Sequence, residues 1–124
     1  MLFDDYVMRQ IKKIGELAAS LAAGLSGRTY ESAEAELDEA YRALLGMERA
    51  LADRMSAESL ARLLGDPGQT RALALLMKAH GDLCASRGEL DAAARLFEKG
   101  LGLLAFAEDA ELSGELEARL TSTR

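Results

Sequence analysis

The residues of this chain whose types and spacing could do chemistry are one histidine and one cysteine. His80 and Cys84 are four positions apart, which places them one turn apart on the same face of a helix. Such a pair could supply a base and a nucleophile, or half of a metal site. Zinc needs three or four ligands, and the chain has no second histidine or cysteine to complete the set. We therefore expect both side chains to pack in the core, and an enzyme that uses them stays a distant alternative.

Other patterns typical of catalysis or cofactor binding are missing from the sequence. The carboxylates form no Glu-x-x-His pair of the kind found in di-iron bundles. The glycines match neither Gly-x-Gly-x-x-Gly nor the P-loop pattern, and we interpret them as helix ends and close-packing points. We predict a protein that is not an enzyme and that uses no metal and no cofactor.

Composition and charge favour a helical protein whose partners are other proteins. Hydrophobic residues make up 49% of the chain but aromatic residues only 5%, so alanine, leucine and methionine must build the core. The net charge of −6 argues against a nucleic-acid partner, because such binding depends on neutralising phosphates. Arg9, Lys12 and Lys13 form only a small basic cluster.

Two features of the sequence bear on the cellular compartment. Cys84 is the only cysteine, so no disulfide can form within one chain, which favours the cytoplasm. Charged residues interrupt the apolar ones near the N-terminus, so we expect neither a signal-peptide core nor a membrane span.

Apolar residues recur at helical spacing along nearly the whole chain. The first stripe steps by three and four through Phe3, Val7, Ile11, Ile14, Ala18, Leu21 and Leu25. A second helix follows Thr29, which is placed to cap it, and the sequence leaves open whether Gly46 bends or ends this helix. No stretch alternates apolar and polar residues as a strand would, so we predict an all-α fold of five to six helices.

Capping signals place the later helices. Ser56 and Gly65 bracket a short helix over 57–64, and Asp66 with Pro67 begins a long helix that ends at Gly88. Another helix is expected from 90 to about 106. A frayed C-terminal helix should follow, anchored only by Leu112, Leu116 and Leu120.

The segment 81–104 has the spacing of a known helical repeat. Its small and bulky positions are Gly81, Gly88, Leu90, Ala93, Phe97 and Gly100. This spacing resembles the tetratricopeptide repeat, a helical hairpin of about 34 residues. Gly100, where the repeat usually has alanine, and His80, where it usually has leucine, are departures. The resemblance implies antiparallel helical hairpins in a single domain over 1–124.

A weaker copy of the same hairpin lies near the N-terminus. Five apolar or small positions recur 60 residues apart, namely Tyr30, Ala33, Leu37, Ala40 and Leu44, followed by Leu90, Ala93, Phe97, Gly100 and Leu104. We predict a degenerate hairpin over 1–46 and a short helical connector over 47–66. The best-matching hairpin then spans 67–107, and a C-terminal helix or tail spans 108–124.

The opening MLFDDYVMRQI adds a second resemblance. It pairs an aromatic residue and Asp-Tyr with Met-Arg-x-Ile, through Phe3, Asp5, Tyr6, Met8, Arg9 and Ile11. The whole chain resembles a family of small uncharacterised bacterial proteins of tetratricopeptide-like fold. That likeness implies the fold and a bacterial source, and no activity.

The predicted function is a non-catalytic interaction module or scaffold that self-associates. Two hairpins leave apolar surface uncovered, and the first helix could cover it in a homodimer through Phe3, Val7, Met8, Ile11 and Ile14. The alternative is a groove that binds a peptide or small ligand, with the repeat resemblance placing Leu75, Lys78, Asp82 and Ala85 in it. Lys78 matches a lysine that some repeats use to clamp a terminal carboxylate, but the charge of Asp82 would repel that ligand.

Overall fold

The computed structural model describes residues 2–25 and 27–123, with side chains from residue 5 onward. Within these residues the chain forms seven helices, joined by loops, and no strand. The helices are α1 (Leu2–Ala22), α2 (Tyr30–Leu45), α3 (Arg49–Ala52), α4 (Ala57–Leu64), α5 (Pro67–Ser86), α6 (Leu90–Leu103) and α7 (Ala110–Thr123). The all-α prediction is confirmed for this part of the chain. The helix beyond the expected five to six is α3, a single turn of 4 residues inside the predicted connector.

Side-chain caps begin the helices where the sequence predicts them. The Thr29 side chain accepts a hydrogen bond from the Ser32 backbone N–H at 3.0 Å, and Ser56 accepts one from Ser59 at 3.1 Å. Asp66 Oδ2 likewise accepts from the Gln69 N–H at 3.0 Å, with Pro67 in the first turn. Each cap satisfies a donor that has no partner inside its own helix.

The structure decides one helix end that the sequence left open and moves two that the sequence predicted. The helix α5 ends at Ser86 and not at Gly88. Gly46 ends α2, because its left-handed backbone with φ of 70° lets its N–H reach the Arg42 carbonyl. The open choice at this residue is thereby resolved. α6 stops at Leu103, short of the expected 106, since the chain turns there through hydrogen bonds to the carbonyls of Gly102 and Leu103.

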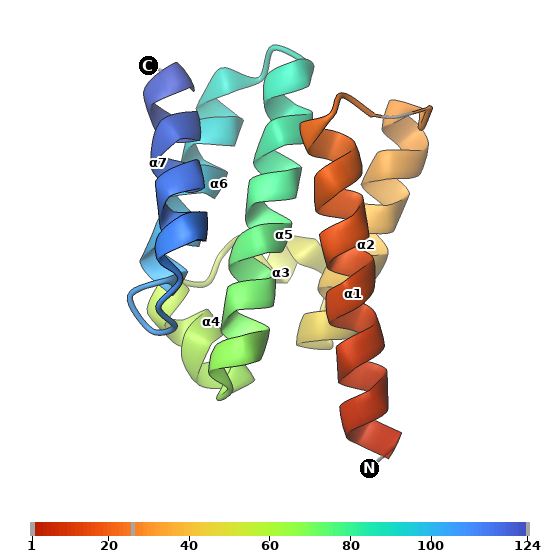
Figure 1. Cartoon of the computed structure of the whole chain (residues 1–124), viewed down its shortest axis with the longest axis vertical. Coiled ribbons are helices and arrows are strands. Elements are labelled where there is room, and N and C mark those ends of the chain that lie inside the picture. The colour runs from red at the N-terminus through yellow and green to blue at the C-terminus, as the bar shows by residue number, and fades with distance from the viewer. Residues whose placement is uncertain (1, 26, 124) are drawn as a thin grey trace.

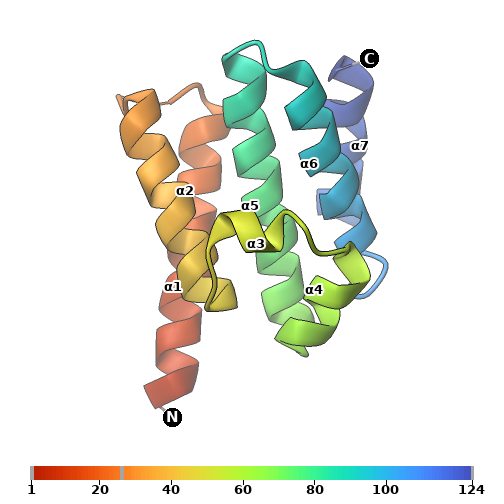
Figure 2. The ribbon, with the colours of Figure 1, turned by 180° about the vertical axis from the view of Figure 1, so that it is seen from behind.

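Successive long helices run antiparallel and form two layers (Figures 1 and 2). One layer holds α1, α5 and α7, and the other holds α2 and α6 with the short α3 and α4. The most extensive contacts join α5 to α6, α1 to α5 and α6 to α7. In Figure 2, α3 crosses the space between α2 and α6 in front of α5. The central helix α5 therefore contacts α1 on one side and α6 on another.

The core lies where α5 meets its neighbours, and small residues permit the close approach. Ala93 and Phe97 of α6 are 0% and 1% exposed. A Cβ added at Gly81 of α5 would overlap the Phe97 ring, with its Cδ1 at 2.8 Å and its Cζ at 2.9 Å. Glycine at this position lets the phenylalanine ring lie directly on the α5 backbone. Leu112 and Leu116 of α7 are also buried in the core.

Among the described helices, none combines the length and the apolar composition that crossing a membrane requires.

Candidate functional site

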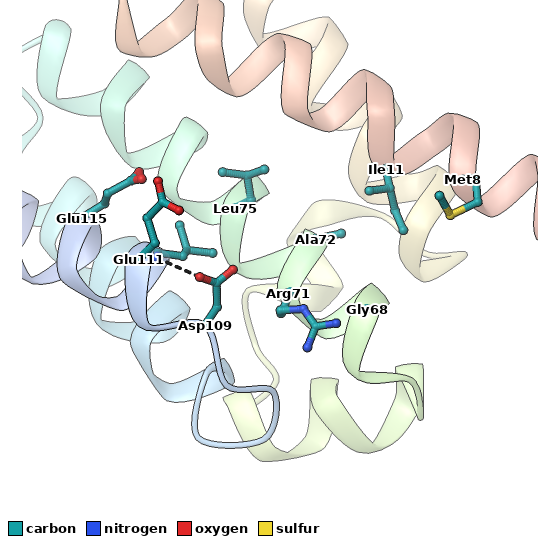
Figure 3. Close-up of a pocket in the computed structure, with 10 residues that line it drawn as sticks. Met8, Ile11, Gly68, Arg71, Ala72, Leu75, Asp109, Glu111 and Glu115 are labelled. Atoms are coloured by element: carbon teal, nitrogen blue, oxygen red, sulfur yellow. Dashed lines mark hydrogen bonds between the residues drawn. The ribbon is translucent and has the colours of Figure 1, made fainter.

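A groove crosses the layer formed by α1, α5 and α7 (Figure 3). It encloses a cavity of about 390 Å³. Apolar residues from all three helices line it, namely Met8, Ile11, Ala72, Leu75 and Leu112. Figure 3 shows Leu75 between Glu115 and Glu111 on one side and Ile11 and Met8 on the other. We call this cavity the α1–α5–α7 groove.

The α7 wall of the groove is acidic. Asp109, Glu111 and Glu115 line it, against the single cation Arg71 of α5. Asp109 also caps α7, because its Oδ1 accepts a hydrogen bond from the Leu112 N–H at 3.0 Å. The groove thus combines an apolar floor with a wall that attracts cations.

The four predicted groove residues do not share one role. Leu75 lines the groove, and Ala85 is half-buried further along α5 and does not line it. Lys78 is only 4% exposed, and its Nζ lies 3.3 Å from Glu115 Oε2. Asp82 Oδ1 accepts a hydrogen bond from Arg119 Nε at 2.7 Å. Both charges on α5 are therefore paired with α7, so Lys78 already holds a carboxylate of its own chain.

The predicted self-association residues differ in how far they are exposed to solvent. Met8 is 64% exposed, and Val7 and Ile11 are half-buried. Ile14 is 1% exposed and packs inside its own chain, so it offers no surface to a second copy. The side chain of Phe3 lies outside the described residues. The sequence pattern did not separate these cases, because one stripe of α1 serves both the core and the surface.

His80 contacts two polar side chains on the opposite side of α5. Tyr41 Oη lies 3.1 Å from its Nδ1, and Arg49 Nη1 lies 3.4 Å from its Nε2. Arginine only donates, so Nε2 must accept and Nδ1 must carry the proton that is donated to Tyr41. Burial, followed by the charge of Arg49, lowers the pKa of His80 from 6.5 to about 4. The ring is therefore neutral at physiological pH.

Cys84 lies one turn further along α5 and is 8% exposed. Burial is the main cause that raises the pKa of its thiol. Both ring nitrogens of His80 contact other groups, and none of the hydrogen bonds described joins the histidine to the cysteine. This arrangement works against a thiolate nucleophile, which requires a lowered pKa and access to solvent.

A second cavity of about 510 Å³ opens beside these two residues. Its lining comes from α3, α5, α6 and the turn after α3, namely Arg49, Asp53, His80, Cys84, Ala92, Arg95, Leu96 and Lys99. We call it the α3–α6 cavity. Lys99 Nζ donates to the backbone carbonyls of Ala52 and Asp53 at 3.3 and 3.2 Å. Burial lowers the pKa of this lysine, with the charge of Asp53 acting in the opposite direction.

Sequence reasoning found His80 and Cys84 but missed the basic residues around them. Arg95 and Lys99 are four positions apart in the sequence, and this spacing alone would have predicted two basic side chains on one face of α6. Arg49 gave no signal, because only the fold brings α3 next to α5.

No group of three or more histidine, cysteine, aspartate or glutamate side chains could hold a metal ion within residues 5–25 and 27–123, whose side chains the structure describes. Comparison of the chain with protein-family models, with curated proteins and with solved structures gives no match. We therefore infer function from the geometry of the described residues.

Proposed function

We propose that this protein is a non-catalytic interaction module of tetratricopeptide-like architecture, which binds a helix or peptide of a partner protein in the α1–α5–α7 groove. Two antiparallel hairpins, α1–α2 and α5–α6, support the architecture, since they pack side by side with α7 as an additional helix on α6. Gly81 against Phe97 supplies the small-against-large contact that the resemblance implies.

The observation that carries the binding proposal is the combination of an apolar floor and an acidic wall. Leu75 and Leu112 line this cavity together with Glu111 and Glu115, of which Glu115 is paired with Lys78 at 3.3 Å. Figure 3 shows Leu75 beside the acidic wall. A helix fits such a groove when it presents apolar residues at helical spacing, flanked by lysine or arginine. Opposite charges across the interface favour encounter and fix the orientation of the ligand.

A synthetic amphipathic peptide tests the groove directly. Its apolar stripe should be leucine, with lysine beside the stripe, and a control peptide should carry glutamate in place of lysine. We expect the lysine peptide to shift the NMR signals of Met8, Ile11, Leu75 and Leu112, and the glutamate peptide to bind at least about tenfold more weakly. Leu75→Glu should abolish binding, while Leu63→Glu, at a 50% exposed position on α4, should not. Shifts scattered over the surface, or equal binding of both peptides, would reject the groove.

Self-association through the start of α1 is a second candidate. It is favoured by two large exposed side chains in this segment, Tyr6 at 43% and Met8 at 64%. Arg9, Lys12 and Lys13 on the same helix could contact acidic side chains of a second copy. Sedimentation equilibrium over the micromolar range should show a dimer that Met8→Glu disrupts and Leu63→Glu does not. A monomer at every concentration would contradict this candidate.

A further inference from the structure

The α3–α6 cavity differs in charge from the rest of the molecule. The chain carries a net charge of −6, yet three cations, Arg49, Arg95 and Lys99, line this cavity against one acid, Asp53. Asp38 lies behind Arg49, with its Oδ1 3.3 Å from Arg49 Nη1. Even with both acids counted, the basic side chains here outnumber the acidic ones.

Neighbouring groups hold two of the three cations, Lys99 and Arg49, without using all their donors. Lys99 gives two hydrogen bonds to carbonyls at the end of α3, and an ammonium group has three N–H donors. Arg49 contacts Asp38 and His80 through Nη1, so the rest of its guanidinium remains available. Arg95 is exposed and lines the cavity.

The remaining lining suits an organic group. Ala92 and Leu96 of α6 supply apolar surface next to the cations. The volume, about 510 Å³, lies within the range of roughly 300 to 1,000 Å³ that is typical of small-molecule sites. Guanidinium groups match the planar oxygen pairs of carboxylates and phosphates, with which they form paired hydrogen bonds.

We propose that the α3–α6 cavity binds a small organic anion, whose carboxylate or phosphate group lies between Arg49, Arg95 and Lys99. His80 forms the floor of this site and Leu96 contacts the organic part of the ligand. The site is separate from the α1–α5–α7 groove, because no residue lines both cavities. The helices α3 and α6 that help to line it lie in the other layer, away from α1 and α7 (Figure 2).

The only histidine in the chain makes the test specific. The imidazole Cε1–H signal of His80 in the full, untagged protein is followed by NMR during separate titrations with inorganic phosphate and with citrate. Sodium chloride at matched ionic strength serves as the reference. A saturable shift with phosphate alone assigns a phosphate ligand, one with citrate alone assigns a carboxylate, and shifts with both support the shared chemistry.

Variants separate a site from general salt effects. Arg95→Gln, at an exposed position that should not disturb folding, is expected to weaken anion binding by about tenfold or more. Arg62→Gln, which removes an exposed cation from α4, should leave the affinity unchanged. The proposal is overturned if neither anion gives a saturable shift beyond that of chloride, or if Arg95→Gln binds as tightly as the parent protein.

Discussion

At the scale of single residues, the environment of His80 has the clearest consequence. Tyr41 and Arg49 contact its two ring nitrogens, and a protonated ring would direct an Nε2–H at the Arg49 guanidinium. The folded protein therefore resists protonation of this residue. The same contacts attach α3 to α5 and α2, so a local electrostatic feature also contributes to the tertiary structure.

The lowered pKa of His80 predicts a stability that depends on pH. The unfolded chain takes up a proton below the ordinary pKa of 6.5, while the folded ring does so only near about 4. Folding stability is therefore fully present above pH 6.5 and falls as the pH decreases toward 4. This residue should account for about 2 kcal/mol of the stability lost between pH 7 and pH 5.

Urea unfolding of the parent protein and of His80→Gln at both pH values measures this contribution. The glutamine variant should lose less stability on acidification, because it removes the histidine and leaves every carboxylate in place. An identical pH dependence for the two proteins would show that the ring is accessible to protons in the folded state.

At the scale of helices, close packing depends on particular glycines. Gly81 and Gly114 both lie inside helices, but a Cβ at Gly81 would overlap the Phe97 ring, whereas a Cβ at Gly114 meets nothing within 4 Å. Alanine should therefore have opposite effects at the two positions. The helix-forming tendency of alanine acts at both, and steric overlap acts only at the first.

We expect Gly81→Ala to lower the free energy of unfolding by about 2 kcal/mol, because the buried ring has no room to move. Gly114→Ala should raise it by about 0.5 to 1 kcal/mol. Thermal and urea unfolding of the two variants provide a matched comparison. A stabilised Gly81→Ala protein would mean that α5 and α6 are further apart than described.

At the scale of the whole molecule, α7 is attached to α5 by charge as well as by leucines. Arg119 and Lys78 lie near the two oxygens of Asp82, at 2.7 Å from Oδ1 and 3.9 Å from Oδ2, and the Asp82 side chain is only 9% exposed. A buried carboxylate that loses its hydrogen-bonding partner is strongly destabilising. This attachment also positions the acidic wall of the groove.

Arg119→Met should therefore lower the stability by about 2 kcal/mol, because it leaves Asp82 with only the distant lysine. Arg62→Met, which breaks the exposed pair with Glu58, should cost less than about 0.5 kcal/mol. Chemical unfolding distinguishes the two cases. Equal effects of the two substitutions would indicate that water reaches Asp82 freely.

The sequence by itself determined the all-helical class and most helix boundaries in the described chain. Thr29, Ser56 and Asp66 act on backbone donors only a few residues away, and Gly65 tolerates the backbone that ends a helix. Such signals are local, so they can be identified without a fold. The apolar stripes likewise predicted which faces would be buried, including Leu37, Phe97 and Leu116.

Only the tertiary structure decided what the polar residues do. It paired Lys78 and Asp82 with α7, and it brought Arg49 beside His80 although 31 positions separate them. It also divided the α1 stripe, burying Ile14 and leaving Met8 at the surface. Helical periodicity shows which residues share a face of a helix, but it does not show which partners charged or surface apolar residues will contact. Their roles depend on which helices meet, and that follows from packing across the whole chain.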